Sequence, residues 1–74
     1  MVGRIPEAIE ELHEALRMNP SSAETHNNLG LALLASDKPR ESIPEFEVAL
    51  HLKPELKDAA ENLQRAQAQL ESQK

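Results

Sequence analysis

The sequence has no cysteine, so it can form neither disulfide bonds nor thiolate metal sites. It has one phenylalanine and no tyrosine or tryptophan, which removes the aromatic platform on which many proteins stack single-stranded bases. Acidic residues outnumber basic ones by 13 to 8, and the net charge of −5 argues against nucleic acid or an anionic membrane as the partner. No apolar run approaches the length of a membrane span, and the N-terminus lacks the apolar core of a signal peptide. We therefore expect no direct membrane contact and favour a cytoplasmic location.

Glycine is also scarce, with two in 74 residues, while alanine, leucine and glutamate are abundant. This composition favours helices throughout the chain. A chain of this length can form one small domain, and a single core of that size is only marginally stable. The fold class we predict is all-α.

Apolar residues recur at spacings of three and four in four segments, which predicts four amphipathic helices. Asn19-Pro20 and Lys53-Pro54 end the first and third helices, because the residue before a proline is pushed out of the α region. The predicted helices cover about residues 5–18, 23–36, 39–52 and 55–72.

Three details of these helices need a structural explanation. Ser21, with Glu24 three residues later, predicts a capping box at the start of the second helix. Gly30 inside that helix costs about 1 kcal/mol relative to alanine, which indicates close approach of another helix. Pro44 either kinks the third helix or delays its start, and we favour a continuous helix with a distorted first turn.

The chain repeats itself with a period of 34 residues. Pro20 and Pro54 are separated by this distance, and residues on both sides of them match at the same offset. A fixed period with one helix pair per unit is typical of a solenoid. The matched pairs are Glu7 and Glu41, Ile9 and Ile43, Glu11 and Glu45, Leu12 and Phe46, Ala15 and Ala49, Leu16 and Leu50, Asn28 and Asn62, Leu29 and Leu63, and Ala32 and Ala66.

At these positions the chain resembles the tetratricopeptide repeat family, whose period is also about 34 residues and whose motif runs Trp-x2-Leu-Gly-x2-Tyr, Ala-x3-Phe, Pro. The matching residues here are His26, Leu29, Gly30, Leu33, Ser42, Phe46 and Pro54. The sequence departs from the motif at His26, Leu33 and Ser42, and it has Asp37 where a turn glycine is usual. We expect His26 to fill a packing position more loosely than an aromatic residue would.

The resemblance implies antiparallel helix hairpins stacked as a right-handed superhelix, in a single domain over residues 1–74. Residues 1–22 would then be the second helix of a preceding repeat, 23–56 a complete repeat, and 57–74 a C-terminal solvating helix. On this division the chain begins in mid-repeat, and we expect it to be a piece of a longer protein.

The resemblance also implies protein–protein interaction, with a peptide or protein segment held on the concave face formed by the second and fourth helices. Asn28 and Asn62 occupy the same slot in successive repeats, and in one branch of the family asparagines at this slot grip the peptide backbone. The alternative is that both are simply hydrated. The expected peptide-binding residues are Glu24, Asn27, Asn28, Leu31, Asp58, Glu61, Asn62 and Arg65.

The charge of this face favours a neutral or basic peptide, because its ionisable residues are mostly acidic. A clamp for acidic tails, the family's other binding mode, would need lysine and arginine where Leu31, Asp58 and Asn62 stand. That mode is therefore not expected.

We expect no catalytic, cofactor-binding or metal-binding residues. His13, His26 and His51 fall on three different predicted helices, without the i, i+4 pair of helical zinc sites. No glycine-rich loop cradles phosphate, and no base orients a nucleophile.

Two alternatives to peptide binding stay open. The first is a homodimer, formed through the apolar stripe of the first predicted helix, which includes Ile5, Ile9, Leu12 and Leu16. The second is a spacer at the C-terminal end of a larger enzyme or membrane protein, because the glutamine-rich last helix suits the end of a solenoid.

Overall fold

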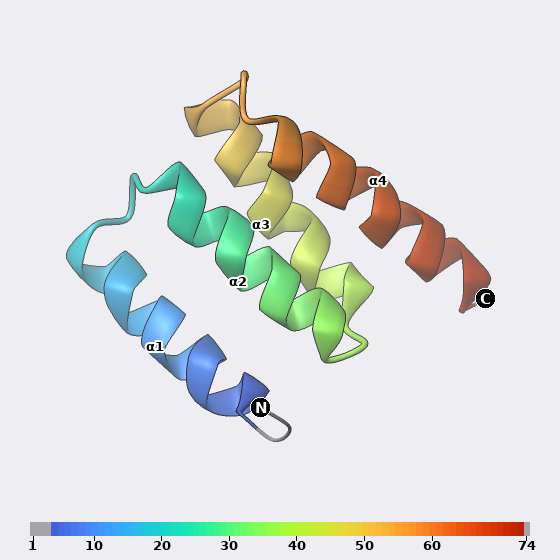
Figure 1. Cartoon of the computed structure of the whole chain (residues 1–74), viewed down its shortest axis with the longest axis horizontal. Coiled ribbons are helices and arrows are strands. Elements are labelled where there is room, and N and C mark those ends of the chain that lie inside the picture. Colours follow the sequence, from blue (N-terminus) through green and yellow to red (C-terminus); the bar gives the residue numbers. More distant parts are fainter. Residues whose placement is uncertain (1–3, 74) are drawn as a thin grey trace.

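The computed structural model describes residues 4–73, which form four helices joined by short turns (Figure 1). The helices are α1 (Ile5–Met18), α2 (Ala23–Ala35), α3 (Pro39–Leu52) and α4 (Lys57–Ser72). The all-α prediction is confirmed, and the four predicted helices agree with the observed ones to within two residues at each end.

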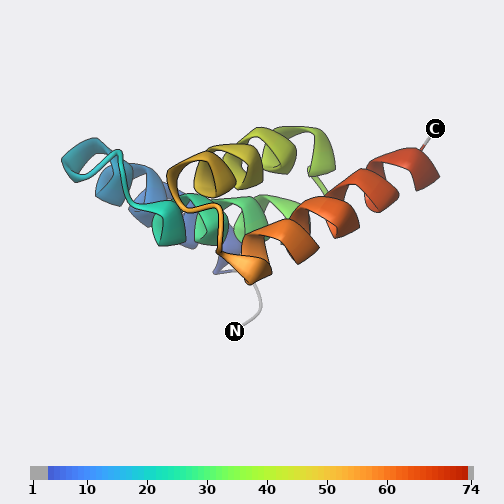
Figure 2. The same cartoon turned by 90° about the horizontal axis from the view of Figure 1, so that it is seen from above.

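Helix α2 is the centre of the arrangement, because it packs against each of the other three helices. It forms an antiparallel hairpin with α3, and α4 packs on both members of that hairpin. Among the described helices, α1 packs on α2 alone. Seen from above, α3 lies on one side of the α2–α4 pair (Figure 2). The helices therefore form consecutive hairpins stacked side by side.

The 34-residue period is visible in the backbone. Asn19 ends α1 with φ −145° and ψ 83°, and Lys53 ends α3 with φ −144° and ψ 85°. The N–H of each residue donates to a carbonyl four positions earlier, Ala15 and Ala49 respectively, at 2.9 Å. Each is followed by proline and a short turn. The repeat in the sequence is therefore also a repeat of local structure.

The N-terminus of α2 differs from the prediction, because the cap is Ser22 rather than Ser21. The Ser22 hydroxyl accepts from the Thr25 N–H at 3.2 Å and bonds the Thr25 hydroxyl at 2.8 Å. Ser22 has the extended backbone of an N-cap and directly precedes Ala23, the first helical residue. Glu24 takes no part in this cap and pairs elsewhere.

The structure confirms the close helix approach predicted at Gly30 and the continuous helix predicted through Pro44. A Cβ atom at Gly30 would lie 2.5 Å from Cε1 of Phe46, so only glycine lets this fully buried ring cross α2. Pro44 is exposed and lies inside a helix that runs without interruption from Pro39. The continuous form of α3 is therefore confirmed.

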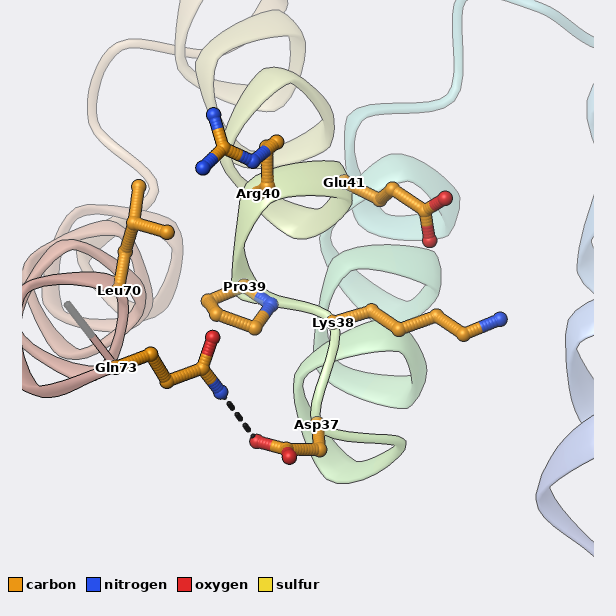
Figure 3. A pocket seen from close by; sticks show the side chains of 7 residues that line it. All are labelled: Asp37, Lys38, Pro39, Arg40, Glu41, Leu70 and Gln73. Carbon is orange, nitrogen blue, oxygen red and sulfur yellow. Dashed lines mark hydrogen bonds between the residues drawn. The ribbon is translucent and has the colours of Figure 1, made fainter.

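The turn between α2 and α3 depends on Asp37, which has a positive φ of 63°. This left-handed conformation is the reason glycine is usual here, and aspartate is one of the few other residues that tolerate it. The Asp37 carboxylate accepts hydrogen bonds from Gln69 Nε2 at 2.8 Å and Gln73 Nε2 at 2.6 Å, of which the second is drawn in Figure 3. Asp37 therefore ties the end of α4 to the turn.

Candidate functional site

The candidate site is a hollow between α2 and α4, which run in the same direction along one side of the molecule (Figures 1 and 2). Its volume is about 570 Å³, and its floor is mainly apolar. Leu31 lies at its edge with 36% of its surface exposed, which is high for a leucine beside a buried core. The lining residues are Leu31, Leu34, Ala35, Arg65, Ala68 and Gln69.

Two of the predicted binding residues, Leu31 and Arg65, line this hollow. Of the other lining residues, Ala35 lies one turn beyond Leu31 on α2, and Ala68 and Gln69 lie one turn beyond Arg65 on α4. The helical period alone would have extended the predicted site to these three. Leu34 lines the hollow and is also part of the buried core. The apolar periodicity of α2 therefore indicates a packing role for it and gives no sign of the hollow.

The two asparagines expected to form a pair in the groove are placed differently from each other. Asn62 is buried, with 6% exposed, and its Nδ2 donates to Oδ1 of Asn27 at 3.1 Å. Arg65 donates to Oδ1 of Asn62 at 3.3 Å, so both ends of the Asn62 amide are occupied within the protein. Asn27, at 7% exposed, is buried in the same contact. The expectation that Asn62 repeats the open position of Asn28 is therefore corrected.

Asn28 is exposed, and its side chain has no partner among the described residues. The 34-residue equivalence explains the difference, since equivalent side chains on parallel helices point the same way. Asn62 on α4 points toward α2, so Asn28 on α2 points away from α4, to the side where residues 4–73 contribute no equivalent helix. Asn28 lies at an open edge rather than between two helices.

The acidic residues occupy the end of the groove where α2 and α4 begin. Asp58 and Glu61 are exposed on α4. Glu24 pairs with Lys53 across the end of the α2–α3 hairpin, with 2.9 Å between Oε2 and Nζ. The hydrogen bond from Lys53 lowers the pKa of Glu24, and the same bond raises the pKa of Lys53. Both groups are therefore charged at neutral pH, and Glu24 already has a cationic partner.

His26 replaces the motif's aromatic residue with a polar connection between three segments. Its Nε2 lies 2.9 Å from the Pro20 carbonyl oxygen, and its Nδ1 lies 2.9 Å from Oε1 of Glu45 on α3. The ring is mostly buried, with 14% of the side chain exposed. The expected loose packing at His26 is thus replaced by two hydrogen bonds, and Glu45 was not foreseen as its partner.

Other parts of residues 4–73 offer less for binding. A second hollow of about 390 Å³ lies where the α2–α3 turn meets the end of α4, and it is lined by Pro39 and Leu70 together with charged and polar side chains (Figure 3). Within the described residues, no group of three or more histidine, aspartate or glutamate side chains is placed to hold a metal ion. None of the described helices has the length and apolarity needed to cross a membrane.

The antiparallel hairpins are stacked, and their backbone conformation repeats along the chain. The groove is lined by every second helix. These features define a helical repeat protein. The family model described as TPR repeat matches residues 3–37, which confirms the resemblance to the tetratricopeptide repeat family over that part of the chain. Repeats of this family generally mediate protein–protein interaction. The match ends at Asp37, so the predicted division into residues 1–22, 23–56 and 57–74 stays a prediction. No curated protein matches the chain.

Proposed function

We propose that this chain binds a peptide or protein segment of a partner along the groove between α2 and α4. The observation that carries the proposal is the hollow of about 570 Å³, whose apolar floor remains open beside Leu31. Sites of this kind hold apolar side chains, and a few polar groups at the rim fix orientation. An apolar side chain of the partner is the anchor we expect in the hollow.

The polar groups along the groove define the rest of the ligand. Asn27, Asn62 and Arg65 form a closed network that holds α2 and α4 at a fixed separation. The Asn27 and Asn62 amides bond each other, and the Arg65 guanidinium bonds Asn62. These three side chains therefore support the groove, and we do not expect them to grip the ligand. Asn28, whose side chain is directed away from α4, takes no part in this groove.

The charge of the groove favours a neutral to basic segment. Asp58 and Glu61 are exposed at the end where α4 begins, and Lys53 already partners Glu24. Arg65 lies one helical turn beyond Glu61, beside the apolar hollow, where it donates to Asn62. A segment with a basic residue several positions from its apolar anchor therefore suits both ends.

The experiment is a selection of peptides from a random library displayed on phage, followed by anisotropy measurements with the selected peptides. Leu31→Gln removes the apolar edge of the hollow and is expected to weaken binding at least about tenfold. Val48→Gln is the matched control, because Val48 is 39% exposed, close to the 36% of Leu31, but lies on α3. If both substitutions weaken binding equally, or neither does, the groove is not the site.

A further inference from the structure

The ring of His26 lies between two hydrogen-bond acceptors. Its Nε2 is 2.9 Å from the carbonyl oxygen of Pro20, in the turn between α1 and α2. Its Nδ1 is 2.9 Å from Oε1 of Glu45 on α3. The side chains of His26 and Glu45 are only 14% and 25% exposed, so water has limited access to their contact. The histidine therefore ties the turn to both helices of the α2–α3 hairpin.

The two contacts of His26 need one proton more than a neutral ring and an ionised carboxyl group supply. A carbonyl oxygen and a carboxylate only accept hydrogen bonds, whereas a neutral imidazole has one N–H and one bare nitrogen. With a neutral ring, one of the two nitrogens would face an acceptor with its lone pair. The extra proton belongs on the ring, because an imidazole is more basic than a carboxylate. Both contacts are therefore hydrogen bonds when the ring is charged.

Glu45 is the ionisable partner of the ring, and other ionisable groups around it are paired or exposed. Glu14 of α1 pairs with Arg17. The hydrogen bond between Glu24 and Lys53 lowers the pKa of Glu24 and raises the pKa of Lys53, so neither titrates near neutral pH. The exposed ionisable residues on the neighbouring elements are His13 on α1, Glu41, Glu47 and His51 on α3, Glu55 in the following turn, and Lys57, Asp58 and Glu61 on α4.

We infer that His26 is a proton-dependent latch, which holds the Pro20 carbonyl when the ring is charged and releases it when the ring is neutral. On deprotonation one proton passes to water and one N–H remains on the ring. This N–H stays on the Glu45 side, because a hydrogen bond to a carboxylate is roughly twice as strong as one between neutral groups. Nε2 is then a bare nitrogen that faces the Pro20 oxygen, so this contact is lost while the Glu45 contact persists.

The latch acts on the turn that carries α1. Within residues 4–73, α1 packs on α2 alone and contributes no buried residue, so the attachment of this turn matters for where α1 lies. Histidine is the side chain whose charge ordinarily changes between about pH 5 and 8. The turn is therefore held most firmly at the acidic end of this range. This device is separate from the α2–α4 groove and does not depend on the groove's function.

The experiment is an NMR titration of the intact, ¹⁵N-labelled protein between about pH 5 and 8. The ring resonances show which nitrogen carries a proton. The Ser21 amide reports on the Pro20 carbonyl, because both belong to the same planar peptide group. We expect both ring nitrogens to be protonated at the acidic end and only Nδ1 in the neutral ring. The Ser21 amide resonance should shift with the same midpoint as the His26 ring.

Glu45→Gln separates a proton-dependent latch from a merely structural contact. A glutamine amide can donate to Nδ1, which leaves Nε2–H for the Pro20 carbonyl without an extra proton. In this variant the neutral ring should carry its proton on Nε2, and the shift of the Ser21 amide should be lost. His13→Gln is the matched control, because it removes an exposed histidine from α1 and should leave the Ser21 shift unchanged.

Two results would overturn the inference. One is a neutral ring in the wild-type protein whose proton lies on Nε2, because the Pro20 contact would then survive deprotonation. The other is a Ser21 amide that does not follow the His26 ring, or that follows it equally in Glu45→Gln. The position of the proton is read in the wild-type protein, so the first result does not depend on the folding of a variant.

Discussion

At the scale of single residues, two departures from the repeat motif, Asp37 and His26, have consequences that the structure makes visible. Asp37 replaces a turn glycine and uses its carboxylate to hold Gln69 and Gln73 of α4. His26 replaces an aromatic residue and connects Pro20 to Glu45. At position 26 hydrogen bonds thus replace aromatic packing, and at position 37 an aspartate with hydrogen-bonded partners replaces a flexible glycine. At Gly30 the motif residue is kept, because the ring of Phe46 fills the space where a side chain would begin.

Gly30→Ala is expected to destabilise the protein, although alanine is the better helix former by about 1 kcal/mol. Its Cβ would lie 2.5 to 2.8 Å from three atoms of the Phe46 ring, which is fully buried and cannot move aside freely. Overpacking of this kind typically costs about 1–3 kcal/mol. Urea unfolding followed by circular dichroism measures the change.

Two further variants show whether the Phe46 contact is the cause. Ala35→Gly, at an exposed position of the same helix, gives the propensity difference without a clash. The double variant Gly30→Ala, Phe46→Leu should lose less free energy of unfolding than the sum of the losses from the two single substitutions, because leucine vacates part of the space. A Gly30→Ala variant more stable than the wild type would contradict the explanation.

At the scale of helices, the sequence predicted position and type well, because each helix has an apolar stripe and the first and third end at an Asn-Pro or Lys-Pro step. It predicted the directions of side chains less well. Equivalent positions such as Asn28 and Asn62 share a direction, but the sequence does not say which neighbour lies there. Periodicity therefore placed both asparagines in the groove, although one is buried between helices.

Pro44→Ala should stabilise α3. Pro44 lies inside the helix, where it cannot donate to the Arg40 carbonyl and its ring crowds that group. It is exposed, so its removal loses little packing, and α1 has Glu10 at the equivalent position. The expected gain is up to about 3 kcal/mol in the free energy of unfolding, measured in urea. Pro39→Ala is the control, because a proline at the first helical position is tolerated; an equal gain from both would refute the argument.

At the scale of the whole molecule, stability is distributed unevenly between the two ends. Helix α4 contributes three buried residues, Ala59, Asn62 and Ala66, and Ala66 joins Leu34 and Phe46 in the core cluster. Within residues 4–73, helix α1 contributes no buried residue and packs on α2 alone. In a solenoid each repeat is stabilised mainly by its direct neighbours. Removal of a terminal helix therefore lowers stability in proportion to the surface of the neighbouring helices that it buries.

Removal of α4 is therefore expected to be far more damaging than removal of α1. A chain of residues 1–56 exposes Leu34 and Phe46 and leaves Asn27 without its partner, so it should lose cooperative thermal unfolding. A chain of residues 20–74 keeps the α2–α3–α4 core and should still unfold in one transition, at a lower temperature than the intact protein. Circular dichroism melting of both chains measures this directly. Equal loss of helicity in the two would mean that α1 supports the core as much as α4 does.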